Sequence, residues 1–146
     1  MHNILVHAHS GWRWVVLVLV VAAIAQAFSK WQSNTALNDG NRKLAMFAMI
    51  SLHIQFLIGL ILYIMDAMNQ TKVQFNENTM SDAMIRFFTV EHSLIMIIAI
   101  GIITVGHSKA KKSQSFKPIF WFYLIGLVVM LSRIPWPGQF PGIGWF

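Results

Sequence analysis

Four long apolar blocks separated by polar segments dominate the chain: residues 12–28, 44–65, 87–105 and 119–131. A helix needs about 17 to 25 predominantly apolar residues to cross the hydrocarbon core of a bilayer. The first three blocks have that length. The fourth reaches it when it is extended over residues 116–134, because Arg133 can place its charged end in the interface. We therefore predict an all-α fold, an integral membrane four-helix bundle that forms one domain over residues 1–146.

The composition agrees with a membrane protein. Hydrophobic residues make up 56% of the chain and charged residues only 11%, whereas a soluble domain carries roughly 25% charged residues. No Lys or Arg precedes Arg13 and no small-residue cleavage site follows a short apolar core, so we expect no cleaved signal peptide. Cysteine is absent, which excludes disulfides, c-type haem attachment and thiolate metal sites.

We expect an interfacial, non-helical tail at residues 135–146 after four helices at about 4–29, 44–66, 84–106 and 117–134. The first helix is extended toward the N-terminus because residues 4–6 are apolar. The tail, counted from Ile134, contains three prolines and three glycines, and proline interrupts a helix. Its tryptophans suit the membrane interface.

The distribution of charge predicts an orientation. The first and third loops, which must lie on the same side of the membrane, contain seven basic residues: Lys30, Arg42, Lys43, Lys109, Lys111, Lys112 and Lys117. The second loop, residues 66–86, carries charges of both signs. Cytoplasmic loops are enriched in Lys and Arg, so we expect both termini outside (N-out/C-out). The net charge of +6 therefore comes largely from loops on one side of the membrane. We expect the lipid bilayer as a partner and no nucleic acid.

Two histidines, His53 and His92, lie within these apolar blocks. An ionisable side chain in hydrocarbon is costly, and its default interpretation is a functional site. Neutral imidazole is also the commonest metal ligand. We therefore predict a buried metal or haem centre. The alternative is that each histidine only forms a hydrogen bond to a neighbouring helix.

The depth of each histidine in the membrane indicates which of them are able to pair. A rise of about 1.5 Å per residue places His53 about 3 Å to the cytoplasmic side of the midplane. It places His92 about 6 Å and His9 about 10 Å to the outer side. His92 is the firmest metal ligand, because it pairs in depth with either of the others. We favour His9 as its partner, and His53 remains the more deeply buried alternative.

Two arginines are candidate cofactor-binding residues. Arg13 follows His9 by four residues, on the same helical face. We expect it to pair with Glu91, linking the first and third helices. Alternatively, Arg13 or Arg133 holds the propionates of a haem, because guanidinium binds carboxylate in a bidentate manner.

Other residues of the second helix and its loop extend the list of candidates. Gln55 is placed to orient an imidazole or to contact a quinone carbonyl, and Gly59 to make room for a flat ring or for close helix packing. Four methionines border the second loop and raise the possibility of copper, since thioether is a soft ligand: Met65, Met68, Met80 and Met84. They lack the tight spacing of a copper site, so we expect ordinary apolar packing.

Several segments together resemble those of small bacterial four-helix membrane proteins described as cytochrome b-like: residues 9–14 (HSGWRW), 52–55 (LHIQ), 90–92 (VEH), 106 with 109–112, and 134–137 (IPWP). The resemblance implies a multi-pass protein of the bacterial inner (cytoplasmic) membrane. It implies haem b bound between helices, with His9, His53 and His92 as candidate ligands. A second haem would need His53 with His107, which lie about 13 Å apart in depth, so we expect one.

The sequence therefore predicts a membrane cytochrome b-like electron-transfer protein that exchanges electrons with quinol or with a respiratory partner. Two axial histidines leave no open position on the iron and favour electron transfer over oxygen chemistry. One alternative is a non-catalytic accessory or assembly subunit of a larger membrane complex. Another is a copper- or zinc-handling membrane protein that uses His9, His53, His92 and Glu91.

Overall fold

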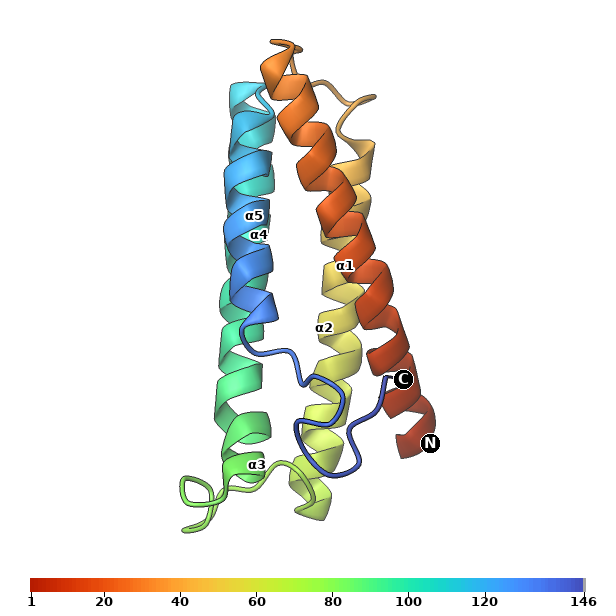
Figure 1. The fold of residues 1–146 in the computed structure, drawn as a ribbon, viewed down its shortest axis with the longest axis vertical. Coiled ribbons are helices and arrows are strands. Elements are labelled where there is room, and N and C mark those ends of the chain that lie inside the picture. Colours follow the sequence, from red (N-terminus) through yellow and green to blue (C-terminus); the bar gives the residue numbers. More distant parts are fainter. Residues whose placement is uncertain (146) are drawn as a thin grey trace.

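The computed structural model describes residues 1–145, and within that range the chain is helical and contains no strand. The elements in chain order are α1 (His2–Gln32), α2 (Lys43–Asn69), α3 (Ala83–Arg86), the π-helical turn η1 (Phe87–Glu91), α4 (His92–Ser113) and α5 (Lys117–Leu131). The segments α3, η1 and α4 join into one long helix, so that four helices stand side by side (Figure 1). The predicted all-α class is confirmed.

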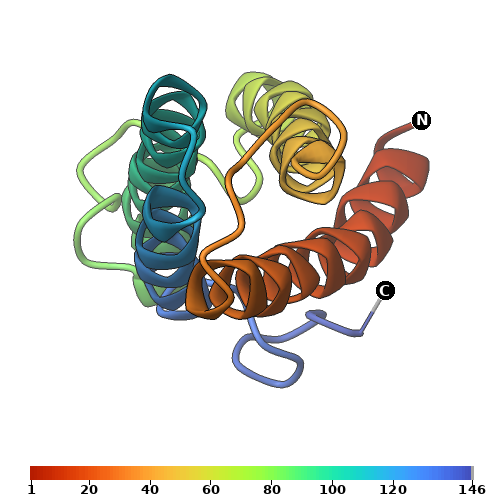
Figure 2. The ribbon, with the colours of Figure 1, turned by 90° about the horizontal axis from the view of Figure 1, so that it is seen from above.

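Successive helices run in opposite directions, and this places the loops at two distinct ends (Figures 1 and 2). Both ends of the chain and the loop at 70–82 lie at one end, which we call the terminal end. The connections at 33–42 and 114–116 lie at the other, which we call the basic end because the seven basic residues named above are in or beside them.

Three of the four helices are long and apolar enough to cross a membrane: His2–Gln32, Lys43–Asn69 and Ala83–Ser113. The fourth, α5, has 15 residues, which corresponds to about 22 Å. It ends at Leu131 rather than at 134, because the chain turns at 132–133 and the residue before a proline disfavours helix. The tail from 135 to 145 is non-helical, and Phe146 lies outside the described residues.

The helices are apolar on their outer faces and pack through small residues inside. Val18, Leu57 and Val128 are each more than half exposed, as expected for side chains that face lipid. The buried contacts between helices include small residues that let backbones approach closely: Ala23, Ala27, Ala45, Ala48, Ala99, Ala110, Gly106 and Gly126.

Candidate cofactor site

A cavity of about 390 Å³ lies between the helices in the half of the bundle nearer the terminal end. Its size is within the roughly 300–1,000 Å³ typical of cofactor and ligand pockets. The walls are mostly apolar, and a few polar side chains from three helices converge on it, including His9, Gln55 and His92. The cavity therefore has the composition expected of a binding site.

The rings of His9 and His92 face this cavity from α1 and α4, with ring centres 6.4 Å apart and planes inclined by 80°. His9 lies over Gly59 of α2, where a Cβ atom would come within 2.8 Å of its Cε1. Gln55 of α2 donates a hydrogen bond of 2.8 Å to the backbone oxygen of His9. The absence of a side chain at Gly59 therefore makes room for the His9 ring. The Gln55 hydrogen bond links α1 to α2 at His9.

The hydrogen bonds of the two imidazoles leave ring nitrogens available. His92 donates from Nδ1 to the backbone oxygen of Arg133 at 2.7 Å, which leaves the lone pair on Nε2. A second hydrogen bond of this kind is the usual way in which a metal-binding histidine is oriented. The Nδ1 atom of His9 is buried and has no hydrogen-bond partner within residues 1–145.

The π-helical turn η1 ends at Glu91, immediately before His92. Such a turn inserts one extra residue into a helix, rotating the residues that follow it by about 100°, and is frequent near functional sites. Thr89 in this turn is buried. Its backbone oxygen accepts from the hydroxyl of Tyr63 at 3.1 Å, and its Oγ1 accepts from the backbone nitrogen of Gln74 at 3.1 Å. The turn thus fixes the rotation of α4 against α2 and the adjacent loop.

His53 is placed differently. Its Nδ1 donates to the backbone oxygen of Met49 in its own helix at 2.8 Å, and its Nε2 lies 3.5 Å from Oγ1 of Thr104. It is not among the described residues that line the cavity. The structure therefore brings His9 and His92 together and leaves His53 in contacts typical of helix packing.

Arg13 contacts the C-terminal tail. Its Nη1 donates to the backbone oxygen of Pro135 at 3.1 Å and its Nη2 to that of Trp145 at 3.0 Å. The ring of Trp145 stacks on Trp14, with 5.8 Å between ring centres. Arg13 also lines the cavity, so it holds the tail across one side of it.

Glu91 forms ion pairs with two arginines, Arg86 at 2.9 Å and Arg133 at 3.2 Å. The pair between Arg13 and Glu91 expected from the sequence does not form, because the two tail carbonyls occupy the Arg13 guanidinium. Arg133 is therefore engaged by Glu91 through its side chain and by His92 through its backbone oxygen.

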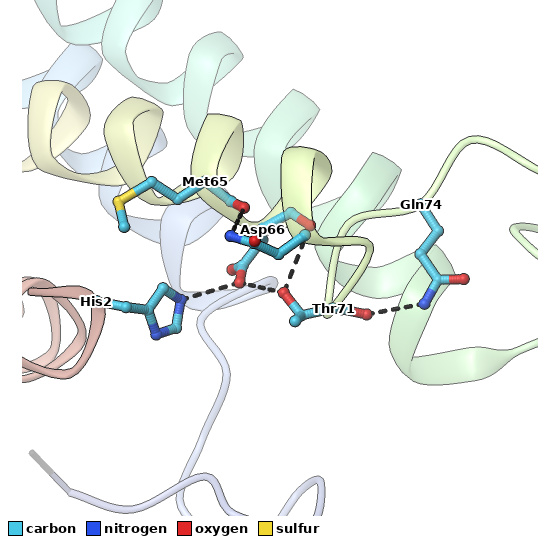
Figure 3. Close-up of polar contacts among 6 residues, drawn as sticks. His2, Met65, Asp66, Thr71 and Gln74 are labelled. Atoms are coloured by element: carbon cyan, nitrogen blue, oxygen red, sulfur yellow. Dashed lines mark hydrogen bonds and ion pairs between the residues drawn. The ribbon is translucent and has the colours of Figure 1, made fainter.

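A second polar cluster lies at the terminal end, where Asp66 at the end of α2 lines the cavity. Figure 3 shows His2 of α1 and Thr71 of the following loop converging on this carboxylate. His2 Nε2 lies 3.0 Å from Asp66 Oδ1, and the Thr71 hydroxyl donates to the same oxygen. This cluster was not predicted from the sequence, where its only signal is an acidic residue directly after an apolar block.

A third cluster lies toward the basic end, away from the cavity. Tyr123 of α5 is fully buried and donates to the backbone oxygen of Ala45 at 2.7 Å. Its hydroxyl lies 3.2 Å from Nδ1 of His107. Tyr123 was not predicted as part of a polar cluster, although a lone hydroxyl in an apolar block indicates a buried hydrogen-bond partner.

The donor set suits a porphyrin better than a bare metal ion. In the described part of the chain no three or more His, Cys, Asp or Glu side chains converge as metal ligands, whereas structural zinc takes four protein ligands. Met68 and Met80 are largely exposed. A porphyrin needs only two axial ligands. The rings of His9 and His92, with centres 6.4 Å apart, are close enough to belong to one such site.

Comparison of the chain with protein-family models, with curated proteins and with solved structures gave no match. The class of protein is therefore defined here by fold and site. Over residues 1–145 it is an all-helical protein of four helices, three of them of membrane-spanning length, with two neighbouring histidines at a largely apolar cavity.

Proposed function

We propose that the protein is a multi-pass membrane cytochrome b-like electron-transfer protein that binds one haem b between His9 and His92. The observation that carries the proposal is the pair of facing imidazoles, 6.4 Å apart between ring centres. The Nδ1 atom of His9 is buried without a partner, and a buried polar atom without a partner is costly unless a ligand satisfies it. A purely structural histidine, such as His53, has its nitrogens in contact with protein groups.

Each polar residue around the cavity has a distinct part in this proposal. His9 and His92 would hold the iron of a haem, and the backbone oxygen of Arg133 orients His92. Gly59 leaves the space in which the His9 ring lies, and Arg13 holds the tail against the cavity. Haem supplies one-electron chemistry when bound, and two axial histidines favour electron transfer over oxygen activation.

The orientation belongs to the same proposal. All seven basic residues of the first and third loops are at the basic end, and the positive-inside rule assigns that end to the cytoplasm. The cavity then lies in the outer half of the bacterial inner membrane. Its redox partner is a membrane quinol or a respiratory complex in the same bilayer.

An optical spectrum of the detergent-purified protein tests the proposal. We expect Soret and alpha bands in the reduced-minus-oxidised difference spectrum of the wild type. In His92→Leu these bands should fall to the background level, although the protein still inserts, because the substitution makes the helix more apolar.

Two results would contradict the proposal. A colourless wild-type protein that contains copper or zinc by elemental analysis would favour a metal-handling protein. A protein with neither pigment nor metal would favour an accessory subunit of a larger membrane complex.

A further inference from the structure

Asp66 lines the cavity, and one of its carboxylate oxygens has no partner among residues 1–145. The residue is only 8% exposed, and His2 and Thr71 both bind its Oδ1. Its Oδ2 accepts no hydrogen bond from residues 1–145. A buried carboxylate in an otherwise apolar membrane helix is costly and by default indicates a functional site. The free oxygen is therefore an acceptor available to a ligand.

The surroundings of Asp66 select the charge and shape of that ligand. Lys72 lines the same cavity, with its Nζ 5.3 Å from the centre of the Phe88 ring. Asp66 disfavours an anion and Lys72 disfavours a cation, so a neutral hydrogen-bond donor fits best. Phe56, Tyr63 and Phe88 also line the cavity, and aromatic side chains favour an aromatic ligand.

Some residues that line the cavity are also exposed, which indicates where it opens. Leu60 of α2 and Ile97 of α4 both line it, and they are 42% and 54% exposed. A residue that lines the cavity and is also exposed on the outer face of a helix marks an opening. The ligand therefore enters between α2 and α4 from the hydrocarbon region, which requires it to be lipid-soluble.

We propose that the end of the cavity at Asp66 binds the head of a lipid-soluble hydroquinone, whose hydroxyl group donates a hydrogen bond to Asp66 Oδ2. Asp66 lies seven residues beyond Gly59, about 10 Å farther along α2, so the head is adjacent to the level of His9 and His92 without occupying the space between them. The inference rests on the proposed function in one respect: the haem proposed there would accept the electrons of the bound hydroquinone. Binding of the hydroquinone itself does not require a haem.

Binding of duroquinol and of duroquinone to the purified full-length protein, measured anaerobically by titration calorimetry, tests this inference. The wild type should bind both, and Asp66→Asn should bind duroquinol about tenfold or more weakly, because the charged acceptor is replaced by a neutral oxygen or by an amide nitrogen that cannot accept. Its affinity for duroquinone, which has no hydroxyl donor, should change less than about threefold. The control Thr71→Val should retain duroquinol binding within about threefold, because it removes a neighbour of Oδ1 but leaves Oδ2 intact.

A second pair of variants avoids the buried carboxylate. Leu60→Trp should weaken the binding of both compounds about tenfold by filling the opening, and Leu57→Trp should not, because Leu57 is exposed on the same helix and lies outside the cavity lining. Absence of binding to the wild type, equal affinity of Asp66→Asn for duroquinol, or full binding by Leu60→Trp would each overturn the inference. Haem absorbance of the same samples distinguishes its failure from failure of the proposed function.

Discussion

The two halves of the bundle use histidine in opposite ways. Toward the basic end, His107 contacts the buried hydroxyl of Tyr123, which in turn donates to Ala45. Toward the terminal end, the Nδ1 atom of His9 is buried without a partner among residues 1–145, and the His9 ring lies beside that of His92 at the cavity. The comparison teaches that burial alone does not distinguish these histidines. They differ in whether the protein supplies a partner for the buried ring nitrogen.

The two halves also differ in how closely their helices pack at glycine. In the half nearer the basic end, Gly106 lies so close to α5 that a Cβ atom would be 2.2 Å from the Cβ of Phe122. In the other half, the atoms nearest to a Cβ added at Gly59 belong to the His9 ring. Small residues therefore bring backbones together in one half and make room for the His9 ring in the other.

The largest effect on stability is expected for Gly106→Ala. The added methyl group meets the rigid Cβ of Phe122, so α4 and α5 must separate, at a cost of about 3 kcal/mol. Thermal unfolding in detergent should show a lower Tm. The control is Gly101→Ala in the same helix, where nothing lies within 4 Å of the added Cβ; this variant should be neutral or slightly stabilised. Equal stability of the two variants would contradict the close packing of α4 on α5.

A smaller loss is expected for Tyr123→Phe. The substitution keeps the ring but removes the hydroxyl, which leaves His107 Nδ1 without that contact in a buried site, at a cost of about 1–2 kcal/mol. The Tm should fall while the amount of bound cofactor per protein stays at the wild-type level. A Tyr123→Phe protein with a wild-type Tm that loses the cofactor would show that the two halves are not independent. That result would contradict the contrast drawn between them.

The helices could be predicted from the sequence because long apolar blocks have one stable arrangement in a bilayer. With four antiparallel helices, both termini and the second loop must lie at the same end of the bundle. Depth arithmetic also gave His9 and His92 similar levels, and in the structure their rings are neighbours. Rise per residue determines position along the helix axis, which is why this part of the site was accessible from the sequence.

Other features were not predictable for physical reasons. The π-helical turn η1 changes the rotation of α4, and apolar periodicity is too weak a signal to reveal one extra residue. The tail has no periodicity, so its carbonyls could not be foreseen as partners of Arg13. The early end of α5 and the His2–Asp66 contact depend on how the ends of helices meet, which the sequence pattern does not specify.

The central claim is that His9 and His92, and not His53, hold the cofactor. The most direct test is the optical spectrum of His9→Ala beside that of His53→Ala, at equal expression and with membrane insertion verified. We expect His9→Ala to lose the low-spin bis-histidine bands and His53→Ala to keep them with at most a small change in stability, about 0.6 kcal/mol for one hydrogen bond between membrane helices. An unchanged bis-histidine spectrum in His9→Ala together with a lost one in His53→Ala would contradict the account.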